Sequence, residues 1–227
     1  FEGGSTFRTD RANDTMSING TMTLNGAVTF SGPQATHTAN ISSDIGGTGS
    51  LTKTGPNTTN LSGANTYTGL TTVNSGTLKA GSGTAFTDTG QLTVSGGTFD
   101  LNGFDAAFTQ TNSGAGTITN SVAGVKTFDT GIVAGTLANL ITGDTALRVT
   151  NNNGVFDLTN TSNNFTGGIT LAGTASGTRM RFTSADSFAS MGSGAITIGE
   201  SATDKAGIYI VSGNNTLTND IIFNTVL

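Results

Sequence analysis

Short runs of alternating apolar and polar residues follow one another along this chain, separated by glycine, asparagine and proline. Residues 51–81 are the clearest example, with large apolar residues at Leu51, Leu61, Tyr67, Leu70, Val73 and Leu78 and turn clusters at Gly55-Pro56-Asn57, Gly63-Ala64-Asn65 and Asn74-Ser75-Gly76. A period of two predicts strands, and the glycine and asparagine clusters predict the turns between them. No window of this stretch keeps the three-and-four spacing of an amphipathic helix.

The same pattern begins near the start of the chain. Pairs of apolar residues occur at Met16 and Ile18, Met22 and Leu24, and Val28 and Phe30, separated by Asn19-Gly20 and Asn25-Gly26. These local spacings fit both a β-helix and an antiparallel meander. Two segments depart from them, since residues 132–141 have near-helical spacing and residues 184–191 could form one helical turn. We expect both to be strand and corner.

A long-range repeat separates the two alternatives. Leu147 aligns with Leu51, Leu158 with Leu61 and Phe165 with Tyr67, at an offset that drifts around 100 residues. One solenoid coil needs roughly 20 to 30 residues, so this repeat predicts a module of four or five coils. We therefore expect one continuous solenoid of roughly nine to eleven coils, with modules at residues 1–46 (partial), 47–143 and 144–227 (partial).

Aromatic and large aliphatic residues are the expected interior. Alternation predicts inward side chains for Phe30, Leu61, Tyr67, Phe86, Phe99, Leu101, Phe108, Phe128, Phe156, Phe165, Phe182, Phe188 and Ile210. Threonine is expected at the outward alternate positions, where its branched side chain suits a pleated surface. Corner asparagines are expected to satisfy backbone groups from coil to coil.

Residues 51–55, 61–69, 71–74 and 76–78 together resemble the passenger-associated transport repeat of bacterial autotransporter passenger domains. Their sequences are LTKTG, LSGANTYTG, TTVN and GTL, and the departures from the family pattern are Pro56 and residues 58–60. The resemblance implies a right-handed parallel β-helix on a secreted or cell-surface bacterial protein. It also implies that a signal peptide and a membrane-anchoring barrel would lie outside this chain.

Composition points the same way. Of 227 residues, 45 are threonine and 34 are glycine, only 10% are charged, and the net charge is −5. The hydrophobic share of 34% is too high for a disordered linker, while good helix formers are scarce. An all-β solenoid or sandwich is therefore favoured. The absence of cysteine leaves the redox compartment open.

Two classes of partner are not expected. Nine basic residues scattered along the chain form no basic patch, which argues against nucleic acid. No apolar run approaches the roughly 20 residues that cross a bilayer, so no membrane insertion by this segment is predicted.

The two ends suggest a segment of a longer protein. Residues 1–14 are charged and are expected to be a solvated loop, with a capping or adhesive edge as the alternative. Residues 221–227 read as a strand in progress. We expect the last coil to be continued by the same long chain or by a copy of it, and the segment alone to self-associate there.

A search for catalytic chemistry yields weak candidates. Asp100 with Asp105, and Glu200 with Asp204, are the closest acidic pairs, and each is expected to be a solvated corner charge. The single histidine, His37, is expected to face outward from a strand. Residues 46–49 lack the lysine and helix of a phosphate loop, and the pairs Gly46-Gly47 and Gly96-Gly97 lack the aspartate of calcium-binding repeats.

No catalytic, cofactor-binding or metal-binding residue is predicted, and no cofactor. An intramolecular isopeptide through Lys53, Lys79, Lys126 or Lys205 has almost no sequence support.

The sequence thus predicts a non-enzymatic structural or adhesive segment at the bacterial cell surface. It would be a stiff extracellular rod that displays or links binding functions. Its partners would be other segments of the same chain, copies stacked end to end, or cell-surface and glycan ligands. The alternatives are a self-stacking filament subunit and a carbohydrate-active β-helix enzyme. Three or more charged side chains in one groove would favour the enzyme.

Overall fold

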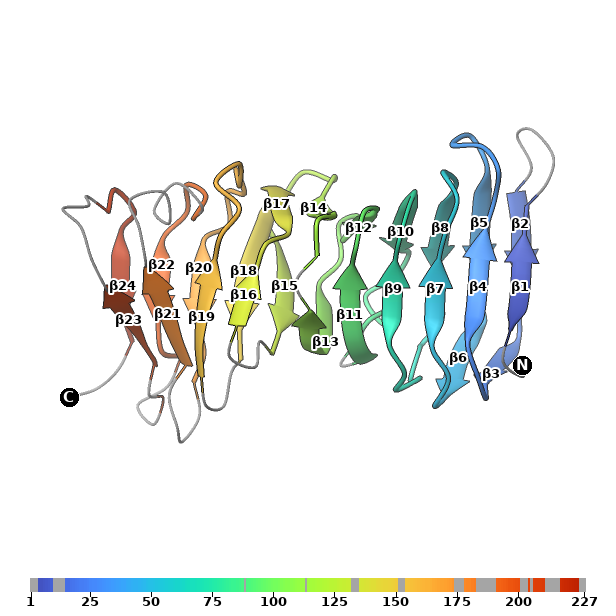
Figure 1. Cartoon of the computed structure of the whole chain (residues 1–227), viewed down its shortest axis with the longest axis horizontal. Helices are drawn as coiled ribbons and strands as arrows, with labels where there is room; N and C mark the ends of the chain where they lie inside the picture. Colours follow the sequence, from blue (N-terminus) through green and yellow to red (C-terminus); the bar gives the residue numbers. More distant parts are fainter. Residues whose placement is uncertain are drawn as a thin grey trace.

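The chain forms an elongated stack of strands in a computed structural model. The structure describes residues 4–9, 15–87, 89–112, 114–131, 135–150, 154–173, 178–182, 191–200, 204, 206–210 and 217–224. These residues form strands and turns and no helix. The strands stand side by side along the long axis, from the N-terminal end to the C-terminal end (Figure 1).

One sheet, sheet A, runs along the whole molecule. Its eleven strands, in spatial order, are β1 (Ser5–Arg8), β4 (Val28–Ser31), β7 (Leu51–Lys53), β9 (Thr71–Val73), β11 (Thr89–Val94), β13 (Ala106–Asn112), β15 (Lys126–Thr130), β18 (Thr145–Val149), β20 (Ile169–Leu171), β22 (Ile196–Ile198) and β24 (Ile221–Phe223).

Three shorter sheets form the other sides. Sheet B has seven strands: β2 (Thr15–Ile18), β5 (Thr38–Ile41), β8 (Thr58–Leu61), β10 (Thr77–Ala80), β12 (Thr98–Asp100), β14 (Thr117–Asn120) and β17 (Leu140–Gly143). Sheet C pairs β3 (Thr21–Leu24) with β6 (Asp44–Gly47). Sheet D contains β16 (Gly135–Leu137), β19 (Gly154–Leu158), β21 (Thr178–Phe182) and β23 (Ala206–Ile210).

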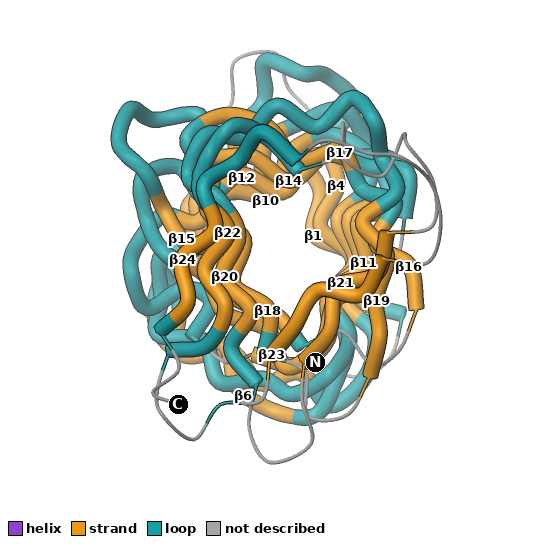
Figure 2. The backbone as a smooth tube through the Cα atoms, turned by 90° about the vertical axis from the view of Figure 1, so that its left-hand side faces the viewer, coloured by secondary structure: helices purple, strands orange, loops and turns teal. Residues whose placement is uncertain are grey.

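The pairing is that of a parallel β-helix and rules out the antiparallel meander. Every described strand pair is parallel. Leu51 of β7 lies opposite Thr71 of β9, one coil later. Seen along the axis, the coils superpose, with strands on the sides and loops at the corners (Figure 2).

The number of coils depends on the side that is counted. Sheet A has eleven strands and sheet B only seven. Counted by the strands of sheet A, the described residues form eleven coils, within the nine to eleven predicted, and counted by sheet B they form seven. The difference arises because the strands are not repeated equally on every side. Sheet D begins at β16, and β17 then runs almost directly into β18 of sheet A.

The predicted interior is confirmed wherever the side chain is described. Phe30, Leu61, Tyr67, Phe86, Phe99, Leu101, Phe108, Phe128, Phe156 and Phe165 are all buried. In the middle of the rod, Phe86, Phe99, Phe108 and Phe128 pack ring against ring, with centroids 5.1 to 6.1 Å apart. The side chains of Phe182, Phe188 and Ile210 lie outside the described part.

Glycines mark the corner that precedes sheet A. A Cβ at Gly49 would lie 2.2 Å from the carbonyl oxygen of Gly26, and one at Gly69 would lie 2.1 Å from that of Gly49. Successive coils therefore touch backbone to backbone at this corner. A larger residue there would have to push the coils apart.

Buried asparagines fill another corner, as the sequence predicted. Asn65 Oδ1 accepts the backbone N–H of Ile45 at 3.0 Å, and its Nδ2 donates to the carbonyl of Ala85 at 2.9 Å. Asn163 Oδ1 accepts the N–H of Ile141 at 2.7 Å in the same way. Since Asn65 and Asn163 align in the long-range repeat, the aligned residues occupy equivalent places. The module boundaries themselves stay a prediction.

Three expectations were wrong or incomplete. His37 is buried in the loop before β5, not exposed on a strand, and its Nδ1 lies 3.2 Å from the carbonyl oxygen of Thr9. Within residues 1–14, Ser5–Arg8 is a strand of sheet A and not a loop. Threonine also enters the interior, at Thr59, Thr71, Thr89, Thr111, Thr130 and Thr145.

The near-helical segments are strand and corner where they are described. Leu137 lies in β16, and Leu140 and Ile141 lie in β17, while residues 132–134 and 183–190 lie outside the described part.

Tyr67 and Phe165 provide a test of the shared interior. Replacing either residue by alanine should lower the free energy of unfolding by about 3 to 5 kcal/mol, since each ring is fully buried. Urea denaturation followed by circular dichroism would measure this. The Tyr67→Phe variant should lose only about 1 kcal/mol, because it removes the hydroxyl that lies 2.7 Å from Thr71 Oγ1. Thr52→Ala, on the outer face, is the control, and an equal loss there would contradict the assignment.

Candidate functional site

The outer face of sheet B carries a column of threonines. The paired registers place one threonine per coil over five successive strands: Thr38, Thr58, Thr77, Thr98 and Thr117. All five are half-buried. Sheet A carries a similar column on its first coils, Thr6, Thr29, Thr52, Thr72 and Thr93. Each face thus begins with a row of uncharged hydroxyl groups.

A second polar column lies beside the threonines of sheet B, and its members bond from coil to coil. Asn60 Nδ2 donates to Asn40 Oδ1 at 3.3 Å. Further along, Lys79 Nζ lies 3.2 Å from Asp100 Oδ2, and Thr142 donates to Thr119 at 2.9 Å. This side of the rod therefore carries a ladder of polar contacts that join several pairs of neighbouring coils.

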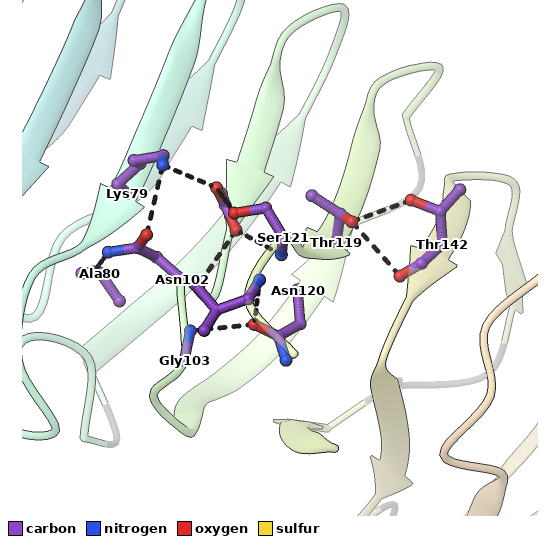
Figure 3. A network of polar contacts seen from close by, with 10 residues as sticks. Lys79, Ala80, Asn102, Gly103, Thr119, Asn120, Ser121 and Thr142 are labelled. Carbon is purple, nitrogen blue, oxygen red and sulfur yellow. Dashed lines mark hydrogen bonds and ion pairs between the residues drawn. The ribbon is translucent and has the colours of Figure 1, made fainter. Parts of the chain in front are cut away.

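Asp100 is the centre of this ladder, and the expectation of a solvated corner charge was wrong. It is only 3% exposed. Its Oδ1 accepts the N–H groups of Asn102 (2.9 Å) and Ser121 (3.1 Å), and its Oδ2 accepts the hydroxyl of Ser121 at 2.7 Å (Figure 3). Lys79 also reaches Asn102 Oδ1 at 3.2 Å. These contacts occupy the carboxylate and join three coils, which is a structural role.

The second member of the pair, Asp105, bonds elsewhere. Its Oδ1 accepts the backbone N–H of Thr127 in the next coil at 2.7 Å. Asp105 is exposed, as predicted. The two carboxylates therefore belong to separate hydrogen-bond networks, and the structure gives them no shared substrate position.

The other acidic pair is part of an ion-pair cluster. Asp204 Oδ2 accepts the backbone N–H of Glu200 at 2.7 Å. Both carboxylate oxygens of Glu200 accept hydrogen bonds from Arg148, at 2.7 and 2.5 Å. Arg148 also donates to Asp129 Oδ2 at 2.5 Å. The cluster lies on sheet A, and sequence reasoning missed it because its members are 52 and 19 residues apart.

The positive charge of Arg148 offsets part of the negative charge of Glu200 and Asp129. The hydrogen bonds from Arg148 to Glu200 raise the pKa of the guanidinium still further. Burial raises the pKa of Asp129, and the positive charge of Arg148 opposes that rise. Both acids are thus held as partners of one arginine rather than as a free acid and base.

A groove lies next to the cluster, where β13 and β15 meet the loop between β10 and β11. It has a volume of about 350 Å³. It is lined by Gly83, Phe86, Thr87, Asp105, Ala106, Ala107, Thr127 and Asp129, of which Phe86 and Ala106 are almost fully buried. Nothing in the local sequence pattern points to this groove, because its residues come from three different coils.

Lys53 is the other feature that sequence reasoning missed. It lies within the motif resembling the transport repeat and is 0% exposed. Its Nζ donates to the carbonyls of Thr54 (2.8 Å), Gly55 (2.8 Å) and Ser75 (3.1 Å) and to Asn57 Oδ1 (2.9 Å). None of these four acceptors is a carboxylate. Burial lowers the pKa of Lys53 to about 8. The lysine ties two successive corners together from inside.

The remaining candidates gain no chemistry from the structure. Gly46 and Gly47 end a strand of sheet C. Lys126 begins β15, and Lys205 lies outside the described residues. Within the described part of the chain, no group of three or more His, Cys, Asp or Glu side chains could hold a metal ion. The same residues contain no helix long and apolar enough to span a membrane.

The class of repeat is confirmed by comparison with known families. Residues 51–80 match the family described as the passenger-associated transport repeat. They cover β7 to β10, the corner glycine Gly69, and Asn65, Tyr67 and Lys53. The residues that carry the motif are therefore those that close the interior and the corners of these coils.

A comparison with individual proteins gives a match of the same kind. The chain is 37% identical over 146 residues, 61% of its length, to the adhesin BmaC autotransporter of Brucella suis biovar 1 (strain 1330). The match spans only 4% of that relative's length. No solved structure matches the chain significantly. The chain is therefore similar to autotransporters over one passenger-associated transport repeat and over a short part of one adhesin.

Lys53 provides a pH-dependent prediction. Between pH 8 and 10.5 the unfolded chain keeps a proton that the folded chain has released, so Lys53 should make stability rise with pH across this window. The rise would be about 3 kcal/mol. In Lys53→Met it should vanish, and the variant should already lose about 2 kcal/mol at pH 7, because four acceptors lose their donor. Urea denaturation at each pH measures both.

Lys79→Met is the matched control, since Lys79 is half-exposed. A rise with pH that is unchanged in Lys53→Met would assign it to another group.

Proposed function

We propose that this chain is a structural and adhesive segment of a surface-displayed bacterial passenger, a stiff rod that displays or links binding functions outside the cell. The observation that carries the proposal is the single ladder of eleven parallel strands in sheet A. In such a stack each coil is held by its neighbours, which gives an extended body with long lateral faces. The adhesin autotransporter relative supports the same reading.

The outer surface suits adhesion better than catalysis. Two columns of threonines, and a third column of amide, hydroxyl and charged groups, offer many weak hydrogen-bonding groups in a regular row. Such a surface gains strength from many contacts along an extended partner rather than from one deep site. Cell-surface molecules and glycans are the proposed ligands, and further segments of the same chain or copies stacked end to end are the proposed neighbours.

The enzyme alternative lacks a suitable arrangement of charges. Two carboxylates, not three or more charged groups, line the groove, and Asp129 is paired with Arg148. In neither of the two acidic pairs found in the sequence do the two described carboxylates face each other across a shared cavity. A non-enzymatic role is therefore the proposal that fits the described residues.

The filament alternative has no separate support. In β24, the side chain of Phe223 is 67% exposed, and Ile221 and Ile222 are also exposed. β24 is the last described strand of sheet A.

Incubation with plant, animal and bacterial polysaccharides should release no reducing ends and no unsaturated sugars. The physical reason is that the described residues include no free acid and base that face each other. A known polysaccharide lyase run in parallel verifies the assay. Turnover that disappears in Asp105→Asn or Asp129→Asn would overturn the non-enzymatic proposal.

Adhesion itself can be measured with the chain coupled to beads. Beads that carry the folded chain should be retained under flow on surfaces coated with host-cell matrix. The Gly69→Val variant should abolish retention, because its side chain would collide with the backbone of Gly49 and break the stack. Circular dichroism would confirm the loss of structure. Equal retention by folded and unstacked chains would mean that the coil surface does not mediate binding.

A further inference from the structure

Two lysines of the described residues donate to the side-chain amide of an asparagine. Lys53 Nζ donates to Asn57 Oδ1 at 2.9 Å. Lys79 Nζ donates to Asn102 Oδ1 at 3.2 Å, and it also lies 3.2 Å from Asp100 Oδ2. Only the second lysine has a carboxylate among its described partners. An amine, a carboxamide and a carboxylate therefore meet on one side of the rod, between β10 and the turn after β12 (Figure 3).

The carboxamide of Asn102 is held against β10 by both of its polar atoms. Its Oδ1 accepts Lys79, and its Nδ2 donates to the carbonyl oxygen of Ala80 at 2.9 Å. Asn102 Cγ is bonded to both atoms, so it lies beside the end of the Lys79 side chain. Groups that one fold holds in contact react as though they were at very high concentration.

Asp100 is placed to carry protons between the two groups. Its side chain is fixed by hydrogen bonds from the N–H groups of Asn102 and Ser121 and from the Ser121 hydroxyl, and it is buried. Its Oδ2 is within the reach that a general base needs to take a proton from Lys79 Nζ. The contacts that hold Asp100 in the fold thus also hold it beside the amine.

The backbone reaction that competes for this carboxamide is disfavoured. An asparagine that precedes a glycine can cyclise when the glycine nitrogen attacks the asparagine Cγ. Here the N–H of Gly103 donates to Asn120 Oδ1 at 2.9 Å, so the fold already uses that nitrogen. Lys79 is the nitrogen nucleophile that the structure places against Asn102.

We propose that Lys79 and Asn102 form an intramolecular isopeptide bond, with Asp100 as the proton carrier. Asp100 takes one proton from the Lys79 ammonium, and the free amine attacks Asn102 Cγ to form the Nζ–Cγ bond. Asp100 passes its proton to Nδ2, the Cγ–Nδ2 bond breaks, and the departing ammonia takes a second proton from Nζ. The products are a secondary amide and one ammonium ion, and Asp100 is ionised again.

The bond joins two neighbouring coils covalently, so that β10 and β12 cannot separate at this point of the rod. Sequence reasoning offered it almost no support because the two residues are 23 positions apart. The inference is independent of the proposed adhesive function, since a rod without a ligand would carry the same cross-link.

Mass spectrometry of the folded chain tests the bond. After incubation, the intact chain should lack the mass of one ammonia molecule. A protease that cleaves before aspartate releases residues 44–87 and 100–104 as separate peptides from an unlinked, unfolded chain. The cross-linked chain should yield the same two peptides joined to each other.

Two variants and one internal control identify the groups that react. Lys79→Arg keeps a positive charge beside Asp100 but has no nucleophilic amine, and it should abolish the joined peptide. Asp100→Asn should slow cross-linking by about 100-fold or more, and its unlinked fragments are residues 44–87 and 88–104. Lys53, which contacts Asn57 without a carboxylate, should remain a free amine. Circular dichroism would show that each variant folds, and Lys53 still tests the need for a carboxylate if Asp100→Asn does not.

Three results would overturn the proposal. The first is an intact mass with no loss of ammonia. The second is a loss of ammonia with the two peptides separate, or one that persists in Lys79→Arg, since either would mark cyclisation of Asn102 with Gly103. The third is equal cross-linking in folded Asp100→Asn, or a bond at Lys53, because either would remove the carboxylate from the reaction.

Discussion

The backbone ladder between coils is the constraint on which this molecule depends. Each strand donates and accepts hydrogen bonds with the strand one coil before and one coil after, in parallel register at a spacing of about 4.8 Å. A residue therefore meets the residue that holds the same place in the neighbouring coil. The threonine columns and the glycine corner at Gly26, Gly49 and Gly69 are both results of this rule. At the corner, backbone touches backbone, so no side chain fits.

The same constraint decides which polar groups can lie inside. A buried amide or ammonium is stable where it replaces hydrogen bonds that the bending backbone cannot make for itself. Asn65 and Asn163 do this for the coils before them, and Lys53 does it for the carbonyls of two corners. The lysine has no carboxylate partner among its four acceptors. Its charge is instead spread over oxygen dipoles, which accounts for a buried cation in a chain with few charges.

These interactions show which parts of the structure were predictable from sequence. The alternation placed Phe30, Leu61 and Phe99 correctly because each lies in a strand, where side-chain direction depends only on parity. The long-range repeat matched Asn65 with Asn163, because both side chains accept a backbone N–H from the preceding coil. Lys53 was missed, although it has the same parity as Leu51 in β7, because lysine is rarely buried and its interior position is therefore not expected. His37 was misplaced because it lies in the loop before β5, where parity carries no information.

Asp100 and the groove were beyond sequence reasoning for a further reason. Asp100 is buried by Ser121, and Asp129 meets Arg148, over separations that depend on the length of each intervening coil. Those lengths vary. Eight residues, 81–88, connect β10 to β11, whereas five, 101–105, connect β12 to β13, and five, 121–125, connect β14 to β15.

This change in coil length accounts for the place of the groove. The groove lies where the longer connection, with Phe86, meets the shorter coils that follow, with Ala107 and Thr127. Sheet A keeps its register across this point, since β11 still pairs with β13 and β13 with β15. A solenoid can thus alter one side of a coil without disturbing the ladder on another. A groove can arise in such a rod from a few residues of length difference between neighbouring coils, with the shared backbone ladder left intact.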